Sequence, residues 1–165
     1  MQIDFVTELF TLAKEKGVNT CLDTSGNPFT REEPFYSKFE KLMEVTDLFM
    51  LDIKEMDEDE HKKLTGQTNK NILDMATCLS DHGKAMWIRH VLVPGITDDD
   101  GQLHRLRAFI DTLKTVERVE ILPYHTLGVF KWKELGIPYA LEDVEPPTKE
   151  QVEHAREIII PGYKS

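Results

Sequence analysis

Short apolar runs alternate with longer amphipathic segments along the whole chain, and this alternation limits the folds that the sequence can adopt. Four runs are apolar and short enough to be strands. They cover residues 18–22, 47–54, 85–93 and 119–124. The run at 47–54 is nearly continuous, which is typical of a strand that is covered on both faces.

Helix-like segments lie between and around these runs. They cover residues 5–16, 34–45, 69–82, 97–115 and 148–159. Thr97 is expected to cap the fourth helix, because the three aspartates that follow it suit the positive end of a helix. Strands that alternate with helices of this length predict βα units and a parallel sheet. The predicted fold is therefore α/β, with four parallel strands of a partial barrel.

The composition excludes several classes of protein. The 165 residues suit one domain, and 20 basic against 30 acidic side chains give a formal charge of −10. This acidic balance argues against nucleic acid as a partner. No apolar run reaches the roughly 20 residues that span a bilayer, and the first residues lack a secretory signal, so no membrane role and a cytoplasmic location are expected. The cysteines, Cys21 and Cys78, are too far apart for a metal knuckle.

Polar side chains gather where the predicted strands end. Parallel α/β folds place their chemistry at the carboxyl ends of the strands. The groups at those ends are Asp23 with Thr24, Asp52 with Lys54, Arg89 with His90, and His125. A buried ionisable group is costly unless it is paired or functional, so these residues predict a rim that binds a ligand.

Each of these residues also has a structural interpretation. Asp23 could cap a turn, Asp52 and Lys54 could form an ion pair, Arg89 could bridge to an acid, and His125 could be a loop histidine. Together they suit a charged small molecule with a carboxylate and hydroxyls, and the two aspartates could share a cation. The chain has no glycine-rich phosphate loop, zinc-protease motif or serine nucleophile elbow.

Four segments carry a resemblance to a known family. They are residues 21–26 (Cys-Leu-Asp-Thr-Ser-Gly), 45–54, 87–95 and 121–128. In order and spacing they resemble the pyruvate formate-lyase activating enzymes, which are radical S-adenosylmethionine (SAM) enzymes, and the similarity covers nearly the whole chain. The resemblance implies a six-stranded partial barrel of TIM type, of which residues 1–165 would be the carboxyl-terminal part. It also implies an activity in which SAM yields a 5′-deoxyadenosyl radical that removes hydrogen from a glycine of the partner lyase.

The resemblance implies roles for individual residues. A monovalent cation, Na⁺ or K⁺, would lie next to the SAM carboxylate. Asp52, Lys54 and His125 would contact the ribose and carboxylate region of SAM, Val91 would touch the adenine through its backbone, and Arg89 would lie where SAM meets the substrate peptide. The residues around the cation would be Asp23, Thr24, Met50 and Asp52.

The family also holds a [4Fe–4S] cluster with a Cys-x3-Cys-x2-Cys motif, and grips SAM with a Gly-Gly-Glu motif. Neither motif occurs in these 165 residues. We therefore expect no iron–sulfur ligand and no catalytic residue in this chain, and no SAM cleavage by the chain alone, with the cluster present only in a longer protein. The missing part would be an amino-terminal strand, helix and strand.

The implied partners are pyruvate formate-lyase, through its glycine loop, and a flavodoxin-type reductant. Without that amino-terminal part, the strand at 18–23 would have a free edge, and exposed edges invite self-association.

Three other interpretations stay open. The chain could be a non-catalytic SAM-binding half that works with a separate cluster-bearing chain. It could serve a different glycyl-radical enzyme. It could also be an unrelated barrel lyase or isomerase.

Overall fold

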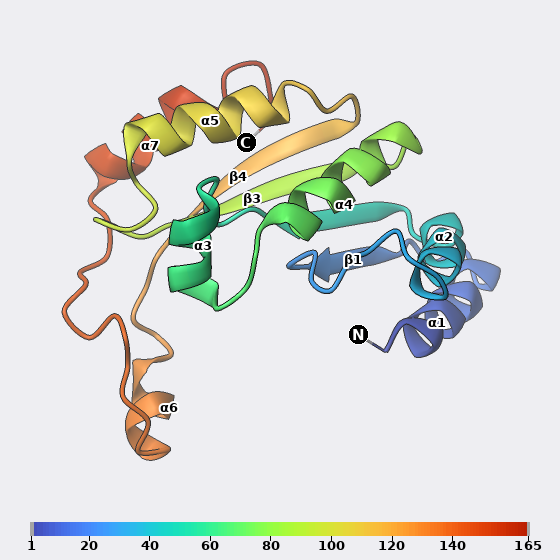
Figure 1. Cartoon of the computed structure of the whole chain (residues 1–165), viewed down its shortest axis with the longest axis horizontal. Coiled ribbons are helices and arrows are strands. Elements are labelled where there is room, and N and C mark those ends of the chain that lie inside the picture. Colours follow the sequence, from blue (N-terminus) through green and yellow to red (C-terminus); the bar gives the residue numbers. More distant parts are fainter. Residues whose placement is uncertain (1, 165) are drawn as a thin grey trace.

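The computed structural model describes residues 2–164, in which four parallel strands lie side by side in chain order (Figure 1). The strands are β1 (Cys21–Thr24), β2 (Leu48–Asp52), β3 (Met86–Leu92) and β4 (Val116–Pro123). Each strand pairs with the next in parallel register. The predicted α/β fold with four parallel strands is confirmed.

Helices precede, connect and follow these strands. They are α1 (Ile3–Glu15), α2 (Phe35–Glu44), α3 (Glu58–Thr65), α4 (Lys70–Asp81), α5 (Asp100–Ile110), α6 (Val129–Glu134) and α7 (Lys149–Ile159). Five of them fall where the sequence predicts helices. The acidic run at residues 57–60 is typical of the start of a solvated helix, and α3 begins within it, whereas α6 was not predicted because it has only six residues. No helix among residues 2–164 is long and apolar enough to cross a membrane.

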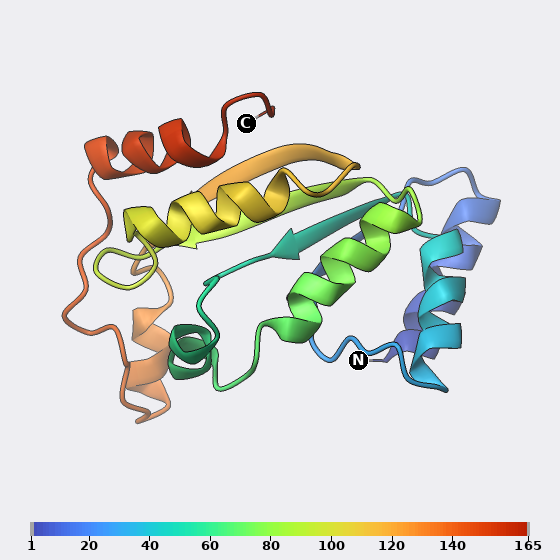
Figure 2. The same cartoon turned by 45° about the horizontal axis from the view of Figure 1, so that its top comes forward.

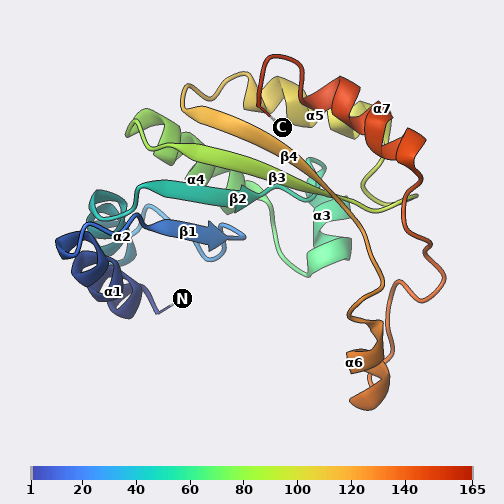
Figure 3. The same cartoon turned by 180° about the vertical axis from the view of Figure 1, so that it is seen from behind.

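The sheet is covered on one face only, and this corrects the expectation for residues 47–54. In β2, Phe49 and Leu51 are buried, whereas the alternating residues are half-buried. The same alternation runs through β3. Figures 2 and 3 show helices packed on one side of the sheet, and the other side uncovered by any described helix. We call this side the open face.

The start of α5 also differs from the prediction. The helix begins at Asp100, and the Asp99 side chain caps it by accepting a hydrogen bond from the Gln102 N–H at 3.0 Å. Thr97 is buried instead, where its hydroxyl donates to the Val91 carbonyl at 2.7 Å and accepts from the Val93 N–H at 2.8 Å. Thr97 therefore fastens the loop to the end of β3 rather than starting the helix.

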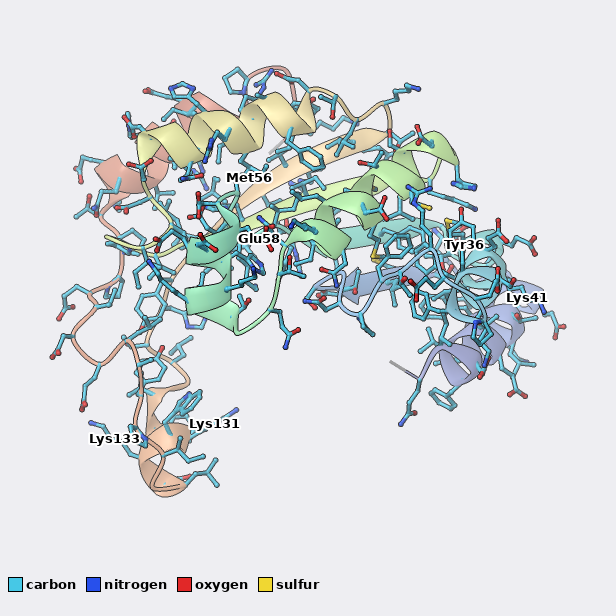
Figure 4. All side chains as sticks on the ribbon, viewed as in Figure 1. Tyr36, Lys41, Met56, Glu58, Lys131 and Lys133 are labelled. Atoms are coloured by element: carbon cyan, nitrogen blue, oxygen red, sulfur yellow. The ribbon has the colours of Figure 1, made fainter. Side chains whose placement is uncertain are left out.

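The segment around α6 projects from the carboxyl ends of the strands. Figure 4 shows Lys131 and Lys133 on this helix, far from the sheet. Leu127 and Leu135 are exposed there. The segment is joined to the sheet by a hydrogen bond of 2.9 Å between the hydroxyls of Tyr124 and Tyr139. This bond raises the pKa of Tyr124 to about 12, so the phenol stays neutral.

His90 lies beside Arg89 in β3 but on the helix-covered face, where it is only 3% exposed. Its Nδ1 lies 2.9 Å from the carbonyl oxygen of Ile53, and its Nε2 lies 2.9 Å from that of Thr97. A neutral imidazole donates from one ring nitrogen and an imidazolium from both. His90 therefore ties the exit of β2 to the loop after β3, directly behind the open face.

Replacing His90 with alanine should lower the free energy of unfolding by about 2–4 kcal/mol, because it leaves a cavity and removes the partner of two buried carbonyls. Urea unfolding followed by circular dichroism measures this change. His104→Ala, at an exposed histidine of α5, is the matched control and should stay within about 0.5 kcal/mol of the unmodified protein. Equal losses for the two variants would contradict the buried link.

Candidate functional site

Arg89 is the centre of an ion network on the open face. Its Nε lies 2.9 Å and its Nη2 lies 2.8 Å from Oδ1 of Asp52. The same Nη2 also contacts Oδ1 of Asp23. Lys54 Nζ donates to the other carboxylate oxygen of Asp52 at 3.0 Å. Two cations and two carboxylates, from three strands and the segment just after β2, thus form one connected, formally neutral cluster.

The register of the sheet brings these residues together. Asp23 of β1 lies opposite Met50 of β2, and Asp52 of β2 lies opposite Arg89 of β3. Side chains two residues apart on a strand share a face, so all four point to the open face. The Ile53 N–H donates to the Arg89 carbonyl at 2.9 Å, which continues the pairing beyond β2.

The network differs in exposure from one member to the next. The side chains of Arg89 and Asp52 are 16% and 18% exposed, whereas that of Asp23 is 56% exposed. Burial opposes the charge on Arg89, but the hydrogen bond to Asp23 and the charge of Asp52 outweigh it and raise the pKa of the guanidinium. Arg89 therefore stays charged, and its contact with Asp23 is the one most open to water.

Thr24 and Gly26 shape the turn that follows β1. The Thr24 hydroxyl accepts a hydrogen bond from the Gly26 N–H at 3.0 Å. Gly26 has a φ of +77°, and a Cβ there would lie 3.1 Å from Cα of Ile72 in α4. Only glycine fits this conformation and this close approach, so the turn is fixed at the carboxyl end of β1.

Val91 and His125 lie farther along the same rim. They share a hollow of about 450 Å³ that is also lined by Leu122, Pro123 and Tyr124. His125 is exposed, two residues after the end of β4. The hydrogen bond from the Tyr124 N–H to the Leu92 carbonyl, 3.0 Å long, holds the ends of β3 and β4 together beneath this hollow.

A second hollow, of about 220 Å³, lies beside the ion network. Asp52 and Lys54 line it together with residues of the β1 turn, α3, the loop after α3 and α4: Ser25, Asn27, His61, Thr65, Gln67 and Ile72. His61 of α3 is buried there. Its Nδ1 lies 2.8 Å from the Gln67 carbonyl, a contact that the helical pattern alone does not reveal.

The structure therefore joins some of the predicted residues and separates others. Asp23, Asp52, Lys54 and Arg89 form the ion network, with Met50 beside Asp23 in the register. Val91 and His125 meet in the larger hollow, and the hydroxyl of Thr24 serves its own turn.

Two open-face residues of β4, Glu120 and Arg118, were not predicted from the sequence. Glu120 lies opposite Arg89 in the β3–β4 register, and Arg118 lies opposite Trp87. Arg118 Nε is 3.3 Å from Oε1 of Glu120, and the guanidinium carbon lies 4.8 Å from the centre of a Trp87 ring. The signal in the sequence is the alternation of Arg118, Glu120 and Leu122, which begins before the predicted strand start at 119.

The cysteines do not fit a [4Fe–4S] cluster. Such clusters are held by several thiolates. Cys21 is exposed on β1 and Cys78 is buried in α4. Partial burial and the Asp23 carboxylate raise the pKa of the Cys21 thiol, which favours its protonated form. Within residues 2–164, no three or more histidine, cysteine, aspartate or glutamate side chains are arranged to hold a metal ion.

Curated relatives match almost the whole of this chain. It is 56% identical over 159 residues to the pyruvate formate-lyase-activating enzyme of Streptococcus mutans, a match that covers 96% of the chain and 60% of the relative. It is 50% identical over 159 residues to the enzyme of the same name from Listeria monocytogenes, covering 96% of the chain and 64% of that relative. The predicted resemblance is confirmed, and the chain spans less than two thirds of the length of these relatives.

Solved structures share the fold. A domain of pyruvate-formate lyase-activating enzyme from Bacteroides vulgatus superimposes with a TM-score of 0.78 at 19% identity, covering 99% of this chain and 89% of that one. Coproporphyrinogen III oxidase (HemN) from Escherichia coli, described as a radical SAM enzyme, gives a TM-score of 0.60 at 11% identity, covering 95% of this chain and 36% of that one. The four-stranded sheet is thus of the radical SAM partial-barrel type.

The family model described as the radical SAM superfamily matches residues 1–106, which include β1, β2, β3 and the ion network. The ion network lies toward the carboxyl ends of these parallel strands. Because the family model matches residues 1–106, the chain belongs to the radical SAM superfamily.

Proposed function

We propose that this chain is the carboxyl-terminal part of a radical SAM activase that installs a glycyl radical on pyruvate formate-lyase. The observation that carries the proposal is 56% identity to the Streptococcus mutans enzyme across 96% of the chain. Membership of the radical SAM superfamily also favours this function over an unrelated barrel lyase or isomerase.

The open-face rim would bind SAM. When SAM is bound beside a reduced cluster, it supplies the 5′-deoxyadenosyl radical. Asp52 and Lys54 would contact the ribose and carboxylate region from one side, and His125 from the other. Val91 would meet the adenine, and Arg89 would lie between SAM and the peptide. Support comes from the two hollows, which between them contain all of these residues except Arg89, and from Arg89's contact with Asp52.

A monovalent cation, Na⁺ or K⁺, would lie beside the SAM carboxylate. Its ligands would come from Asp23, Thr24, Met50 and Asp52. One nitrogen of Arg89 contacts both aspartates, so their carboxylates lie close enough to share one positive group. Oxygen ligands of this kind suit hard cations.

The remaining parts of the machinery lie outside these residues. The [4Fe–4S] cluster would belong to the longer protein, because two distant cysteines cannot hold it. The glycine loop of pyruvate formate-lyase would be the substrate, and a flavodoxin-type protein would be the reductant. A second candidate, favoured by the lack of cluster ligands here, is a non-catalytic SAM-binding half that pairs with a cluster-bearing chain. The related activity toward another glycyl-radical enzyme would use the same rim.

The isolated chain should not cleave SAM. After anaerobic reconstitution with iron and sulfide and reduction by dithionite, chromatography should detect no 5′-deoxyadenosine, whereas the full-length Streptococcus mutans enzyme should produce it. Turnover by the isolated chain would contradict the assignment of the cluster to a longer protein.

A chimera tests the proposed activity itself. In it, this chain replaces the matching 159 residues of the Streptococcus mutans enzyme, which keeps its own cluster-bearing part. The chimera should form 5′-deoxyadenosine and should produce a glycyl-radical signal on pyruvate formate-lyase in electron paramagnetic resonance. A chimera that assembles its cluster and cleaves SAM, yet leaves the lyase unmodified, would show that a different glycyl-radical enzyme is served. A cluster-loaded chimera that does not cleave SAM would contradict the activase function.

The free edge of the sheet should cause self-association. Among residues 2–164, no strand pairs with the outer edge of β1, and Phe5, Leu9 and Leu12 leave an exposed apolar stripe on the neighbouring α1. Unpaired strand edges recruit further strands. Light scattering should therefore show dimers or larger species as concentration rises.

A double variant, Leu9→Glu with Leu12→Glu, should shift this equilibrium toward the monomer. Leu135→Glu, at an exposed position on the distant α6 segment, is the control and should not. An unmodified chain that stays monomeric at high concentration would refute association at this edge.

A further inference from the structure

We infer that Arg89 is an exchangeable internal counter-ion, which holds Asp23 and Asp52 while the rim is empty and moves to Glu120 when a positively charged ligand group enters between the two aspartates. The inference rests on the proposed function, because it assigns the entering group to SAM or to the cation beside it. It adds Glu120 to the site as a positioning residue.

Arg89 already fills the space between the two aspartates. Its Nη2 contacts Oδ1 of Asp23 and lies 2.8 Å from Oδ1 of Asp52. A cation or an ammonium group cannot bind both carboxylates while the guanidinium remains there. Ligand entry therefore requires Arg89 to leave at least one of them.

The contact between Arg89 and Asp23 spans two strands. Arg89 lies in β3 and Asp23 in β1, two strands away, and strands lie roughly 4.8 Å apart, so the two side chains together bridge roughly 10 Å of the open face. An extended, partly exposed arginine gives up side-chain entropy to hold this contact. Since Asp23 is 56% exposed, water competes for the far end of the bridge.

An alternative partner for Arg89 lies close by. Glu120 of β4 is directly opposite Arg89 in the register, on the same face, at about half the lateral distance that separates Arg89 from Asp23. Its carboxylate contacts Arg118 through one oxygen, with 3.3 Å between Arg118 Nε and Oε1. A rotation of the Arg89 side chain toward β4 would thus exchange one charge-assisted contact for another.

The Arg89 side chain thus has two positions in equilibrium, one at the two aspartates and one at Glu120. A ligand shifts such an equilibrium only by its difference in affinity for the two states. Glu120 stabilises the released position of Arg89, so losing its charge should weaken the binding of any ligand that needs the release. The contacts of Arg89 with Asp23 and Asp52 in the empty rim should remain.

The test follows Arg89 directly by nuclear magnetic resonance of ¹⁵N-arginine-labelled protein. The Arg89 Nε–Hε signal is assigned by its loss in Arg89→Lys. The chain is kept in choline chloride and titrated with NaCl at constant total salt, and a separate sample is titrated with SAM. We expect the Arg89 signal to shift to a saturating new position in at least one titration. The titrant that shifts the Arg89 signal, NaCl or SAM, identifies the group that enters between the aspartates.

Substitutions in β4 test the role of Glu120 through their effect on ligand affinity and on the Arg89 signal. Glu120→Gln should lower the affinity for the active titrant about 10-fold and should alter the final position of the Arg89 signal, because a charge-assisted contact becomes a neutral one. Glu120→Asp keeps the carboxylate and should restore most of the affinity. Glu117→Gln, at an exposed position of the same strand, is the matched control and should change neither quantity.

Two results would overturn the inference. If, in uniformly ¹⁵N-labelled protein, SAM shifts the amide signals of Val91 and His125 while the Arg89 Nε–Hε signal stays in place, the rim binds SAM without the exchange, and only this inference fails. If neither titrant shifts any open-face signal, both the inference and the proposed SAM site fail. Equal affinities for Glu120→Gln and the unmodified chain would also remove Glu120 from the site.

Discussion

The contact of Arg89 with two aspartates is the interaction on which the site depends. It joins three neighbouring strands across the open face, because Asp23, Asp52 and Arg89 come from β1, β2 and β3. Buried ion pairs add little net stability, since desolvation offsets much of their attraction. The network therefore fixes the positions of its charged groups more than it stabilises the sheet.

The sheet is stabilised from its other side. Phe49, Leu51, Met86, Ile88 and Leu92 are buried beneath the helices, whereas their neighbours along each strand face the open side. Because the two faces of the sheet differ, one strand can contribute both to the covered face and to the charged site on the open face. In β3, His90 fastens loops on the covered face, while Arg89 organises charges on the open one. A parallel sheet with consecutive strands in register then brings the polar groups to one rim.

The sequence allowed much of this to be predicted, for reasons that specific residues illustrate. The apolar runs indicated the four strands, and polar residues at their ends, such as Asp52 and His125, indicated the rim. Thr97 was misassigned because a threonine before three aspartates looks like a helix cap, whereas its hydroxyl binds the end of β3. Glu120 was missed because its importance comes from the register with Arg89, and a single sequence does not reveal strand register.

The central claim is that the rim around Asp52 binds SAM, and calorimetric titration of the chain with SAM tests it most directly. Asp52→Asn should weaken binding about 10-fold or more, because it removes a charged partner from the rim. Asp74→Asn should leave binding unchanged, since that aspartate pairs with Arg31 at an exposed site outside the network. Absence of SAM binding, or equal affinities for the two variants, would contradict the account.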